Sequence, residues 1–180
     1  MKTIFLDRDG VINEDSGYVH TWKMFEFLPG VIDALEIFLN LNFEIIVVTN
    51  QSGIARGMYT EKDVQALHFE LDLFLKRQGL FIRDFYYCPH HPHGTETDYS
   101  IFCNCRKPRP GMLHKAVSEH SCDLSSSIMV GDKWSDIEAG LSAGVGKNFL
   151  ITDNDTPCKP ELDSKVGRVN SLLQVARILS

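Results

Sequence analysis

Basic residues are scarce in this sequence, and long apolar runs are missing from it. The 180 residues include 18 lysines and arginines against 24 aspartates and glutamates, a formal net charge of −6. Nucleic-acid-binding proteins usually carry a basic face, so this balance argues against nucleic acid as a partner. No apolar run approaches the roughly 20 residues that span a bilayer, and the amino-terminal segment turns acidic at Asp7, too early for a secretory signal. We therefore expect a cytoplasmic protein with no membrane partner, while a small anionic substrate would need only a few local cations.

Cysteines are also few, and they are unevenly spaced. Cys88, Cys103 and Cys105 fall in one short stretch, while Cys122 and Cys158 stand apart and are best interpreted as packing or surface residues. In a protein without a secretory signal, clustered cysteines favour a bound metal over disulfides.

Short apolar runs alternate with helical patterns along the chain. Continuous runs such as Ile45-Ile46-Val47-Val48 are typical of parallel strands that are covered on both faces. The alternation predicts an α/β fold with a doubly wound, mostly parallel sheet, and the length suits one domain over residues 1–180. The expected strands are Thr3–Asp7, Glu44–Thr49, Asp84–Cys88, Ser127–Asp132 and Lys147–Ile151; the expected helices are Gly30–Leu41, Thr60–Gln78, Gly111–His120, Ser135–Ala143 and one that begins near Asn170 or Ser171.

The helix expected from Thr60 has the clearest start and stop signals. Thr60 and Asp63 have the spacing of a capping box, and Gly79 can end the helix. Apolar residues between them recur at helical spacing, which predicts one buried face.

One segment, residues 88–105, has no periodicity and is longer than most structureless loops of a globular domain. Its two ends carry Cys88-x-His90 and Cys103-x-Cys105, which together offer the four ligands of a closed, structural zinc site. His91 or His93 could replace His90 as the fourth ligand. A disulfide from Cys105 to Cys103 or Cys88 is the competing interpretation, which a reducing compartment disfavours.

Polar residues follow the expected strands where a parallel sheet binds its ligands, beyond the carboxyl ends. Asp7 and Asp9 follow the first strand, and Asp132 and Asp136 follow a later one. Two like charges 4 Å apart repel by about 4 kcal/mol at an effective dielectric of 20, so this group of carboxylates needs a cation. Magnesium takes a few carboxylates and leaves positions for water and phosphate. The plain alternative is that these aspartates cap helices and turns, most of all Asp136.

Four segments in chain order resemble the signature motifs of the haloacid dehalogenase superfamily of phosphatases. They are Asp7-Arg8-Asp9-Gly10, Thr49-Asn50-Gln51, Lys107 within Cys105-Arg106-Lys107-Pro108, and Gly131-Asp132 with Asp136. Each motif is weak alone, but four in order over residues 7–136 make a specific match. The resemblance implies a Rossmann-like fold, and no insertion after the first or second motif is large enough for a cap domain.

The resemblance also implies roles for the matching residues. Asp7 is expected to attack phosphorus and become an aspartyl phosphate, and Asp9 to protonate the leaving oxygen and then activate water. Thr49 and Lys107 are expected to bind the transferred phosphoryl oxygens. The implied magnesium ligands are Asp7, the backbone carbonyl of Asp9 and Asp132, with Asp136 orienting Lys107 or the groups around the metal.

The aperiodic loop makes the resemblance more specific. Cys88-Pro89-His90-His91-Pro92, followed by Cys103-x-Cys105-Arg106-Lys107-Pro108, is similar to the D,D-heptose 1,7-bisphosphate phosphatases of the histidinol-phosphatase-like branch. In that family the loop zinc is structural; here it would position Arg106 and Lys107. The resemblance implies hydrolysis of the 7-phosphate of heptose 1,7-bisphosphate to the 1-phosphate, in the synthesis of nucleotide-activated heptose.

The sugar and the second phosphate must then be bound by polar groups near the motifs. Hydroxyl and amide side chains can hydrogen-bond the sugar, and Arg106 can bind a phosphate through two hydrogen bonds. The candidate substrate-binding residues are Asp15, Ser16, Gly17, Tyr18, Asn50, Gln51, Ser52, Arg106 and Lys133.

Two other functions remain open from the residues. Histidinol phosphate carries positive charge, and Glu14 and Asp15 would suit it. A non-catalytic, zinc-stabilised binding module would be expected to have lost one of the motif aspartates, and all are present. We expect a monomeric enzyme that acts on a small sugar phosphate.

Overall fold

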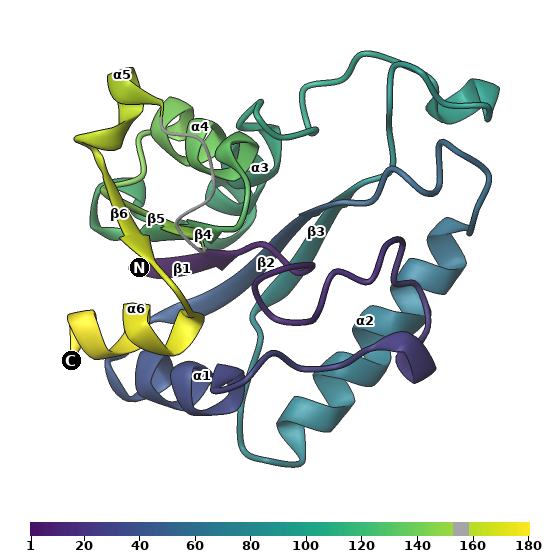
Figure 1. Cartoon of the computed structure of the whole chain (residues 1–180). Coiled ribbons are helices and arrows are strands. Elements are labelled where there is room, and N and C mark those ends of the chain that lie inside the picture. Colours follow the sequence, from purple (N-terminus) through teal and green to yellow (C-terminus); the bar gives the residue numbers. More distant parts are fainter. Residues whose placement is uncertain (153–158) are drawn as a thin grey trace.

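The computed structural model describes residues 1–152 and 159–180, so Cys158 lies outside the described residues. Its centre is a six-stranded, fully parallel sheet with the order β3-β2-β1-β4-β5-β6 (Figure 1). The strands are β1 (Thr3–Leu6), β2 (Glu44–Asn50), β3 (Asp84–Cys88), β4 (Ile128–Gly131), β5 (Lys147–Ile151) and β6 (Val166–Val169).

Helices cover both faces of this sheet (Figure 1). They are α1 (Val31–Asn40), α2 (Glu61–Lys76), α3 (Gly111–His120), α4 (Trp134–Ala143), α5 (Pro160–Asp163) and α6 (Leu172–Leu179), with short 3-10 helices at Trp22–Met24, Thr97–Tyr99 and Leu124–Ser126. Within the described residues, no helix is long and apolar enough to cross a membrane.

Successive strand residues face opposite layers, which explains the continuous apolar runs. Ile4 and Leu6 pack in a core with residues of α1, α2 and α6, while Phe5 between them packs in a second core with residues of α3 and α4. All three side chains are fully buried. This two-sided burial is the reason why β1, β2 and β4 lack the polar alternation of a half-exposed strand.

The capping box at the start of α2 is confirmed. The Asp63 backbone N–H donates to Thr60 Oγ1 at 3.3 Å, and the Thr60 backbone N–H donates to Asp63 Oδ2 at 2.7 Å. Together these contacts satisfy two amide groups that the first turn of a helix leaves without partners. Gly79 follows the helix end with a φ of 75°, a conformation that glycine adopts without strain.

The expected elements lie within two residues of those observed, but β6 and α5 were not predicted. β6 reads Val166-Gly167-Arg168-Val169, is mostly half-buried and lies at the edge of the sheet. Glycine and arginine in so short a run hide the strand pattern. Only its pairing with β5 makes this segment a strand.

Strand order reverses at β1, which lies between β2 and β4. The segments that leave these three strands diverge at such a point and open a crevice beyond their carboxyl ends. Asp7 follows β1, Thr49 and Asn50 end β2, and Asp132 follows β4. The fold therefore gathers these residues at one edge of the sheet.

Candidate active site

Asp7 lies at the floor of this crevice and is buried. Its backbone N–H donates to the carbonyl of Val130 on β4 at 3.0 Å, which continues the β1–β4 ladder by one residue. The Arg8 backbone N–H donates to Asp7 Oδ1 at 2.7 Å. These contacts fix both the backbone and the carboxylate of Asp7.

Lys107 is the cation opposite Asp7, and its side chain is fully buried. The ammonium lies 3.1 Å from Asp7 Oδ1 and 2.7 Å from Asp136 Oδ1, and it donates to the Val48 carbonyl at 2.7 Å. Burial alone would lower the pKa of Lys107, but the carboxylates of Asp136 and Asp7 outweigh it and raise that pKa. Lys107 is therefore a charged lysine with three partners in fixed positions.

The Asn50 side chain holds the Lys107 backbone from β2. Asn50 Nδ2 donates to the Lys107 carbonyl, and the Lys107 N–H donates to Asn50 Oδ1, both at 3.1 Å. These two hydrogen bonds fasten the segment after the cysteine-rich loop to the second motif.

Three carboxylates at this edge lie close enough together to hold a cation. Oxygens of Asp7, Asp132 and Asp136 all lie within 4.8 Å of one another. Burial raises the pKa of Asp7, and burial together with the Asp7 charge raises the pKa of Asp132 to about 7. Oδ1 of Asp132 is buried and has no hydrogen-bond partner among the described residues. A divalent cation such as magnesium fits this donor set, because it would neutralise the repulsion and supply the missing partner.

Gly10 shows how closely these segments approach. Its φ is 84°, and a Cβ atom at this position would lie 2.4 Å from Asp132 Oδ2. Any side chain here would push Asp132 away from Asp7, so the glycine of the first motif is required by both its backbone conformation and its contact.

Asp136 is both a helix cap and a partner of the lysine. Its Oδ2 accepts the backbone N–H of Lys133 at 3.0 Å at the start of α4, while Oδ1 meets the Lys107 ammonium. The capping interpretation and the functional one are thus compatible, since each uses one carboxylate oxygen.

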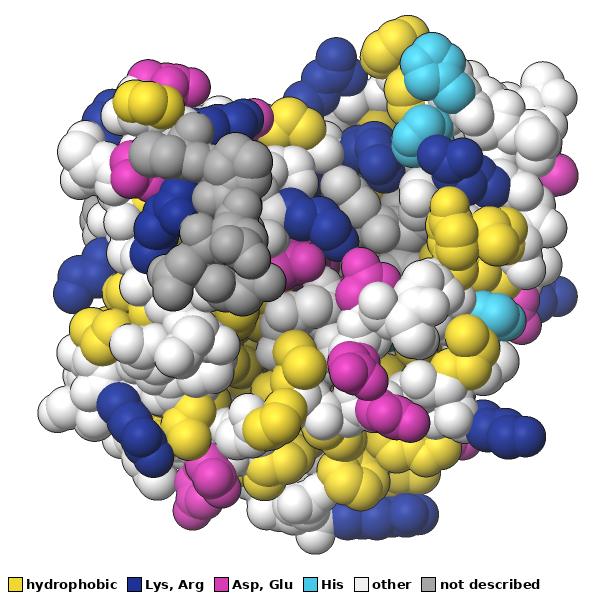
Figure 2. Space-filling view, in the orientation of Figure 1, with side chains coloured by type: hydrophobic (Ala, Val, Ile, Leu, Met, Phe, Trp, Pro, Cys, Tyr) yellow, Lys and Arg dark blue, Asp and Glu magenta, His cyan; other side chains and the backbone are white. Residues whose placement is uncertain are grey.

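The crevice is a cavity of about 520 Å³, a size typical of small-molecule sites. Figure 2 shows acidic and basic side chains next to one another near the centre of the molecular face that it draws. Lys133 lies at the cavity, 3.1 Å from Asp15 Oδ2 and 3.4 Å from Asp132 Oδ2. The lining residues are Asp7, Asp9, Asp15, Gly17, Tyr18, Thr49, Asn50, Gln51, Ser52, Tyr59, Arg106, Lys107, Pro108, Lys133, Ser135 and Asp136.

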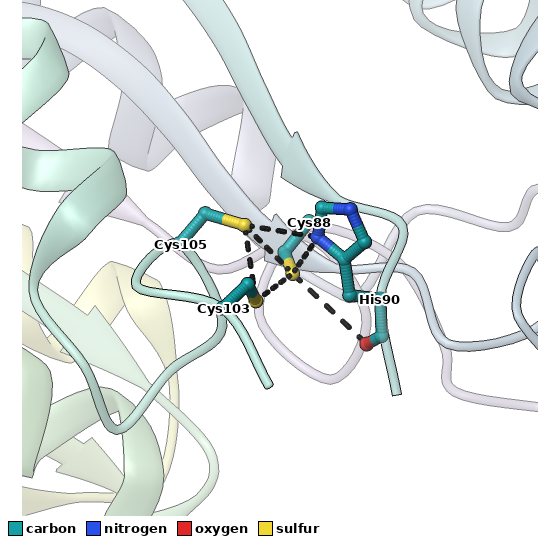
Figure 3. Close-up of side chains that lie close together, drawn as sticks. All are labelled: Cys88, His90, Cys103 and Cys105. Atoms are coloured by element: carbon teal, nitrogen blue, oxygen red, sulfur yellow. Dashed lines mark hydrogen bonds between the residues drawn. The ribbon is translucent and has the colours of Figure 1, made fainter. Parts of the chain in front are cut away.

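A second cluster holds the two ends of the 88–105 loop together. The sulfurs of Cys88, Cys103 and Cys105 and Nδ1 of His90 point toward one another (Figure 3). The sulfurs lie 3.1 to 3.6 Å apart, and Nδ1 lies 3.3 Å from Cys105 Sγ and 3.7 Å from Cys88 Sγ. Tetrahedral zinc with Zn–S bonds of about 2.3 Å needs sulfurs about 3.8 Å apart. The sulfurs would need to move apart by about 0.2 to 0.7 Å to take such an ion.

The chemistry of the cluster also fits a metal. The hydrogen bond with Cys88 lowers the pKa of Cys105 to about 5, which favours the thiolate, the form that binds metals. His91 and His93 lie outside the cluster of described metal-ligating groups. Cys105 directly precedes Arg106 and Lys107, and Arg106 Nη1 donates to the His90 carbonyl at 3.2 Å. The cluster thereby orders the segment that carries both cations.

Comparison with known proteins identifies the family. The HAD-hydrolase-like family model matches residues 104–163. A D-glycero-beta-D-manno-heptose-1,7-bisphosphate 7-phosphatase of Escherichia coli (strain K12) is 44% identical over 180 residues, covering 99% of this chain and 94% of the relative. The D-glycero-alpha-D-manno-heptose-1,7-bisphosphate 7-phosphatase of Photorhabdus laumondii is 41% identical over 99% of this chain and 97% of its own. This chain belongs to the heptose-1,7-bisphosphate 7-phosphatase family of haloacid dehalogenase hydrolases.

A solved structure of the family agrees with the fold described above. D,D-heptose 1,7-bisphosphate phosphatase from B. bronchiseptica, complexed with magnesium and phosphate, is 31% identical and superposes with a TM-score of 0.85, over 99% of this chain and 98% of its own. The Rossmann-like fold, the family resemblance and the parallel sheet predicted from the sequence are therefore confirmed.

The structure brings most of the predicted site residues of this family member to one cavity. The four candidate catalytic residues, Asp7, Asp9, Thr49 and Lys107, line it, as do the substrate-binding candidates other than Ser16. Asp132 lies beside the cavity, against Gly10. The side chains of Asn50 and Gln51 are already used in contacts within the protein, so their hydrogen-bonding capacity for a sugar is reduced.

Four residues of the site were not among the predicted site residues. Tyr59, Pro108 and Ser135 line the cavity, and Arg8 lies against Asp9, fully buried. Pro108 directly follows Lys107 of the third motif. Ser135 carried a signal, since it lies between two residues of the fourth motif. The position of Arg8 between two motif aspartates was also a signal in the sequence, because an arginine there either faces solvent or pairs with one of the two carboxylates. Tyr59 carried none, since it reaches the cavity only through the turn that precedes α2.

Proposed function

We propose that this protein is a magnesium-dependent phosphomonoester hydrolase that removes the 7-phosphate of heptose 1,7-bisphosphate. The observation that carries the proposal is Asp7 at the floor of the cavity, paired with the buried Lys107 and close to the partnerless oxygen of Asp132. This arrangement provides a nucleophile, a cation for the phosphoryl group and a place for a metal. Sequence identity above 40% with two enzymes named for this activity supports the substrate class.

Asp7 would act as the nucleophile and Asp9 as the acid and base. The Asp7 carboxylate attacks phosphorus, and the oxygen of the departing sugar takes a proton from Asp9. Asp9 then removes a proton from the water that hydrolyses the aspartyl phosphate. Lys107 and the Thr49 hydroxyl bind the transferred phosphoryl oxygens.

Magnesium would be held by the Asp7 carboxylate, the Asp9 backbone carbonyl and Asp132. When bound, it neutralises charge on the phosphoryl group and orients the reacting atoms. Asp136 Oδ1 holds the Lys107 ammonium at 2.7 Å.

Two cations at the cavity suit a substrate with a second phosphate. Arg106 and Lys133 line the cavity on segments that follow β3 and β4. The sugar would contact Ser52 and the segment from Asp15 to Tyr18. All of these residues except Ser16 line the cavity. Histidinol phosphate, the alternative substrate, is not favoured, because it has no second phosphate for these cations and the enzymes compared above are named for the heptose.

Magnesium-dependent phosphate release from a small panel of substrates tests the proposal. The panel contains both anomers of heptose 1,7-bisphosphate, histidinol phosphate and an aryl phosphate. We expect kcat/KM for one heptose anomer to exceed that for the other substrates by about 100-fold, or about 2.7 kcal/mol. A larger kcat/KM for histidinol phosphate would contradict the substrate class, and no turnover at all would contradict the enzyme.

We also propose that the protein works as one domain over residues 1–180, as a cytoplasmic monomer with no nucleic-acid partner. The six-stranded sheet and its two cores supply the domain. Sedimentation of the purified chain would test the monomer.

The proposed ion at Cys88, His90, Cys103 and Cys105 is structural zinc, since four protein ligands leave no position for substrate. We expect Cys103→Ser to lose stoichiometric zinc, as measured by elemental analysis. We also expect it to lower the free energy of unfolding by roughly 2–5 kcal/mol. This loss is smaller than the roughly 10–16 kcal/mol that zinc contributes to zinc-finger peptides, because the sheet of this protein has hydrophobic cores of its own. Cys122→Ser is the matched control: Cys122 is buried outside the cluster, and its variant should keep zinc. Wild-type protein purified without zinc would contradict the site.

A further inference from the structure

Arg8 is a buried arginine that the proposed mechanism does not use. Its side chain is 0% exposed, although it lies between the two aspartates of the first motif. Nη2 lies 2.9 Å from Asp9 Oδ1 and 3.0 Å from Asp9 Oδ2, and Nε donates to Oδ1 at 3.2 Å. Nη2 also donates to the Val19 carbonyl at 2.5 Å. Among the described residues, Asp9 is the one carboxylate in ion-pair contact with Arg8.

His68 on α2 contacts the guanidinium of Arg8. Its Nε2 lies 3.3 Å from Arg8 Nη1, and its ring stacks on Phe85 with 4.8 Å between the centroids. Burial, together with the charge of Arg8, lowers the pKa of His68 to about 3. The ring is therefore neutral and can accept a hydrogen bond from Arg8 without competing with it for Asp9.

Gln51, which directly follows β2, holds Oδ2 of Asp9 and is supported by Tyr59. Gln51 Nε2 donates to Asp9 Oδ2 and to Thr49 Oγ1, both at 2.9 Å. The Tyr59 hydroxyl donates to Gln51 Oε1 at 2.7 Å. Because Oε1 accepts from Tyr59, the amide must present its N–H groups to Asp9 and Thr49.

Tyr59 is itself held tightly in place. Its ring is 8% exposed, and a Cβ atom added to Gly53 would lie 2.1 Å from Tyr59 Cε1. The His20 ring stacks on it at a centroid distance of 4.9 Å. The tyrosine is thus a rigid support for the Gln51 amide.

We propose that Arg8 and the Gln51–Tyr59 pair are positioning residues that hold Asp9 in the orientation from which it protonates the leaving oxygen. The inference rests on the proposed function, whose acid is Asp9. A general acid must lie within about 2.6–3.2 Å of the atom it protonates, and a displacement of about 1 Å can cost on the order of 100-fold in rate. Asp9 has a 17% exposed side chain at the cavity. Its Oδ1 also accepts a hydrogen bond from Asn13 Nδ2 at 2.9 Å, but among the described residues Arg8 is the side chain that binds both oxygens at once and so opposes rotation of the carboxylate.

The step that depends on this orientation is the departure of the alcohol. As the bond from Asp7 oxygen to phosphorus forms, the bond from phosphorus to the leaving oxygen breaks. Its electron pair stays on that oxygen, which takes a proton that Asp9 has gained from solvent before the step. Asp9 becomes the carboxylate that Arg8 and Gln51 bind through both oxygens, and this carboxylate is the base for the following hydrolysis. Aryl leaving groups are stable as anions and need this proton little, whereas alkyl and sugar leaving groups need it strongly.

Leaving-group dependence therefore tests the proposal. For Arg8→Met we expect kcat/KM to fall by about 100-fold for heptose 1,7-bisphosphate and other alkyl phosphates, and by less than about 10-fold for an aryl phosphate with an acidic leaving group. Tyr59→Phe keeps the packed ring and removes one hydroxyl, so we expect the same selectivity with a loss of about 3–10-fold for alkyl phosphates. Thermal unfolding of each variant shows whether it folds. If Arg8→Met does not fold, the comparison of alkyl and aryl phosphates in Tyr59→Phe still tests the proposal.

A double-mutant cycle separates positioning from a structural role. In an Asp9→Asn background, Arg8→Met should cause no further alkyl-selective loss, because the acid that Arg8 positions is gone. An equal loss for aryl and alkyl phosphates in both single variants would overturn the proposal. If the wild-type protein hydrolyses other alkyl phosphates but not heptose bisphosphate, the substrate assignment fails while this comparison still stands.

Discussion

Asp7→Asn should abolish turnover and leave the fold intact. The substitution replaces the attacking oxygen by an amide that cannot form an acyl phosphate, so we expect kcat to fall on the order of 10⁴-fold or more. Its structural cost is small because burial already disfavours the Asp7 charge, as the raised pKa of this carboxyl shows, and Lys107 keeps Asp136 as a partner. Phosphate release and thermal unfolding, measured on the same preparation, check both halves of the prediction.

Asp72→Asn is the matched control for this substitution. Asp72 pairs with Lys76 at 2.7 Å on α2, far along the chain from the motifs, and its variant should retain wild-type activity. Borohydride reduction of the wild-type protein during turnover should convert residue 7 to homoserine if the aspartyl phosphate forms. Activity retained in Asp7→Asn would rule out this covalent route.

Lys107→Met should lower both stability and activity. Methionine has a similar length but no charge, so Asp7, Asp136 and the Val48 carbonyl would lose a partner that lies within 3.1 Å of each. Removing one member of a buried ion pair costs about 3–5 kcal/mol, because the remaining charge is left without compensation. Loss of a cation that faces the phosphoryl group should lower kcat/KM by roughly 10²–10³-fold. Denaturant unfolding and initial rates measure the two effects.

Lys76→Met is the same substitution in an exposed pair. The Lys76 side chain is 51% exposed and lies 2.7 Å from Asp72, as close to its carboxylate as Lys107 is to Asp136. Exposed pairs contribute about 0–1 kcal/mol, so this variant should differ little from wild type. Equal losses in the two variants would contradict the proposed role of burial at Lys107.

The order of residues determined the positions of five strands and five helices. Continuous apolar runs could be assigned to strands because β1, β2 and β4 are covered on both faces. The capping box of α2 and the glycine after it could be recognised because their contacts join residues close in the sequence. β6 could not, because a short edge strand with glycine and arginine is defined by pairing with β5 rather than by its own pattern.

The motif residues were also predictable, since each follows a strand and the carboxyl ends of parallel strands meet at one edge. Tertiary structure alone decided which partners these residues have. Lys107 is a surface lysine or a buried cation depending on where Asn50, Asp136 and Val48 lie, and these are distant in the sequence. Arg8 shows the same limit: its charge is evident from the sequence, but its burial against His68 and Asp9 arises only when α2 packs on the sheet. Local patterns encode which elements form, whereas the environment of a charged group depends on contacts that only folding creates.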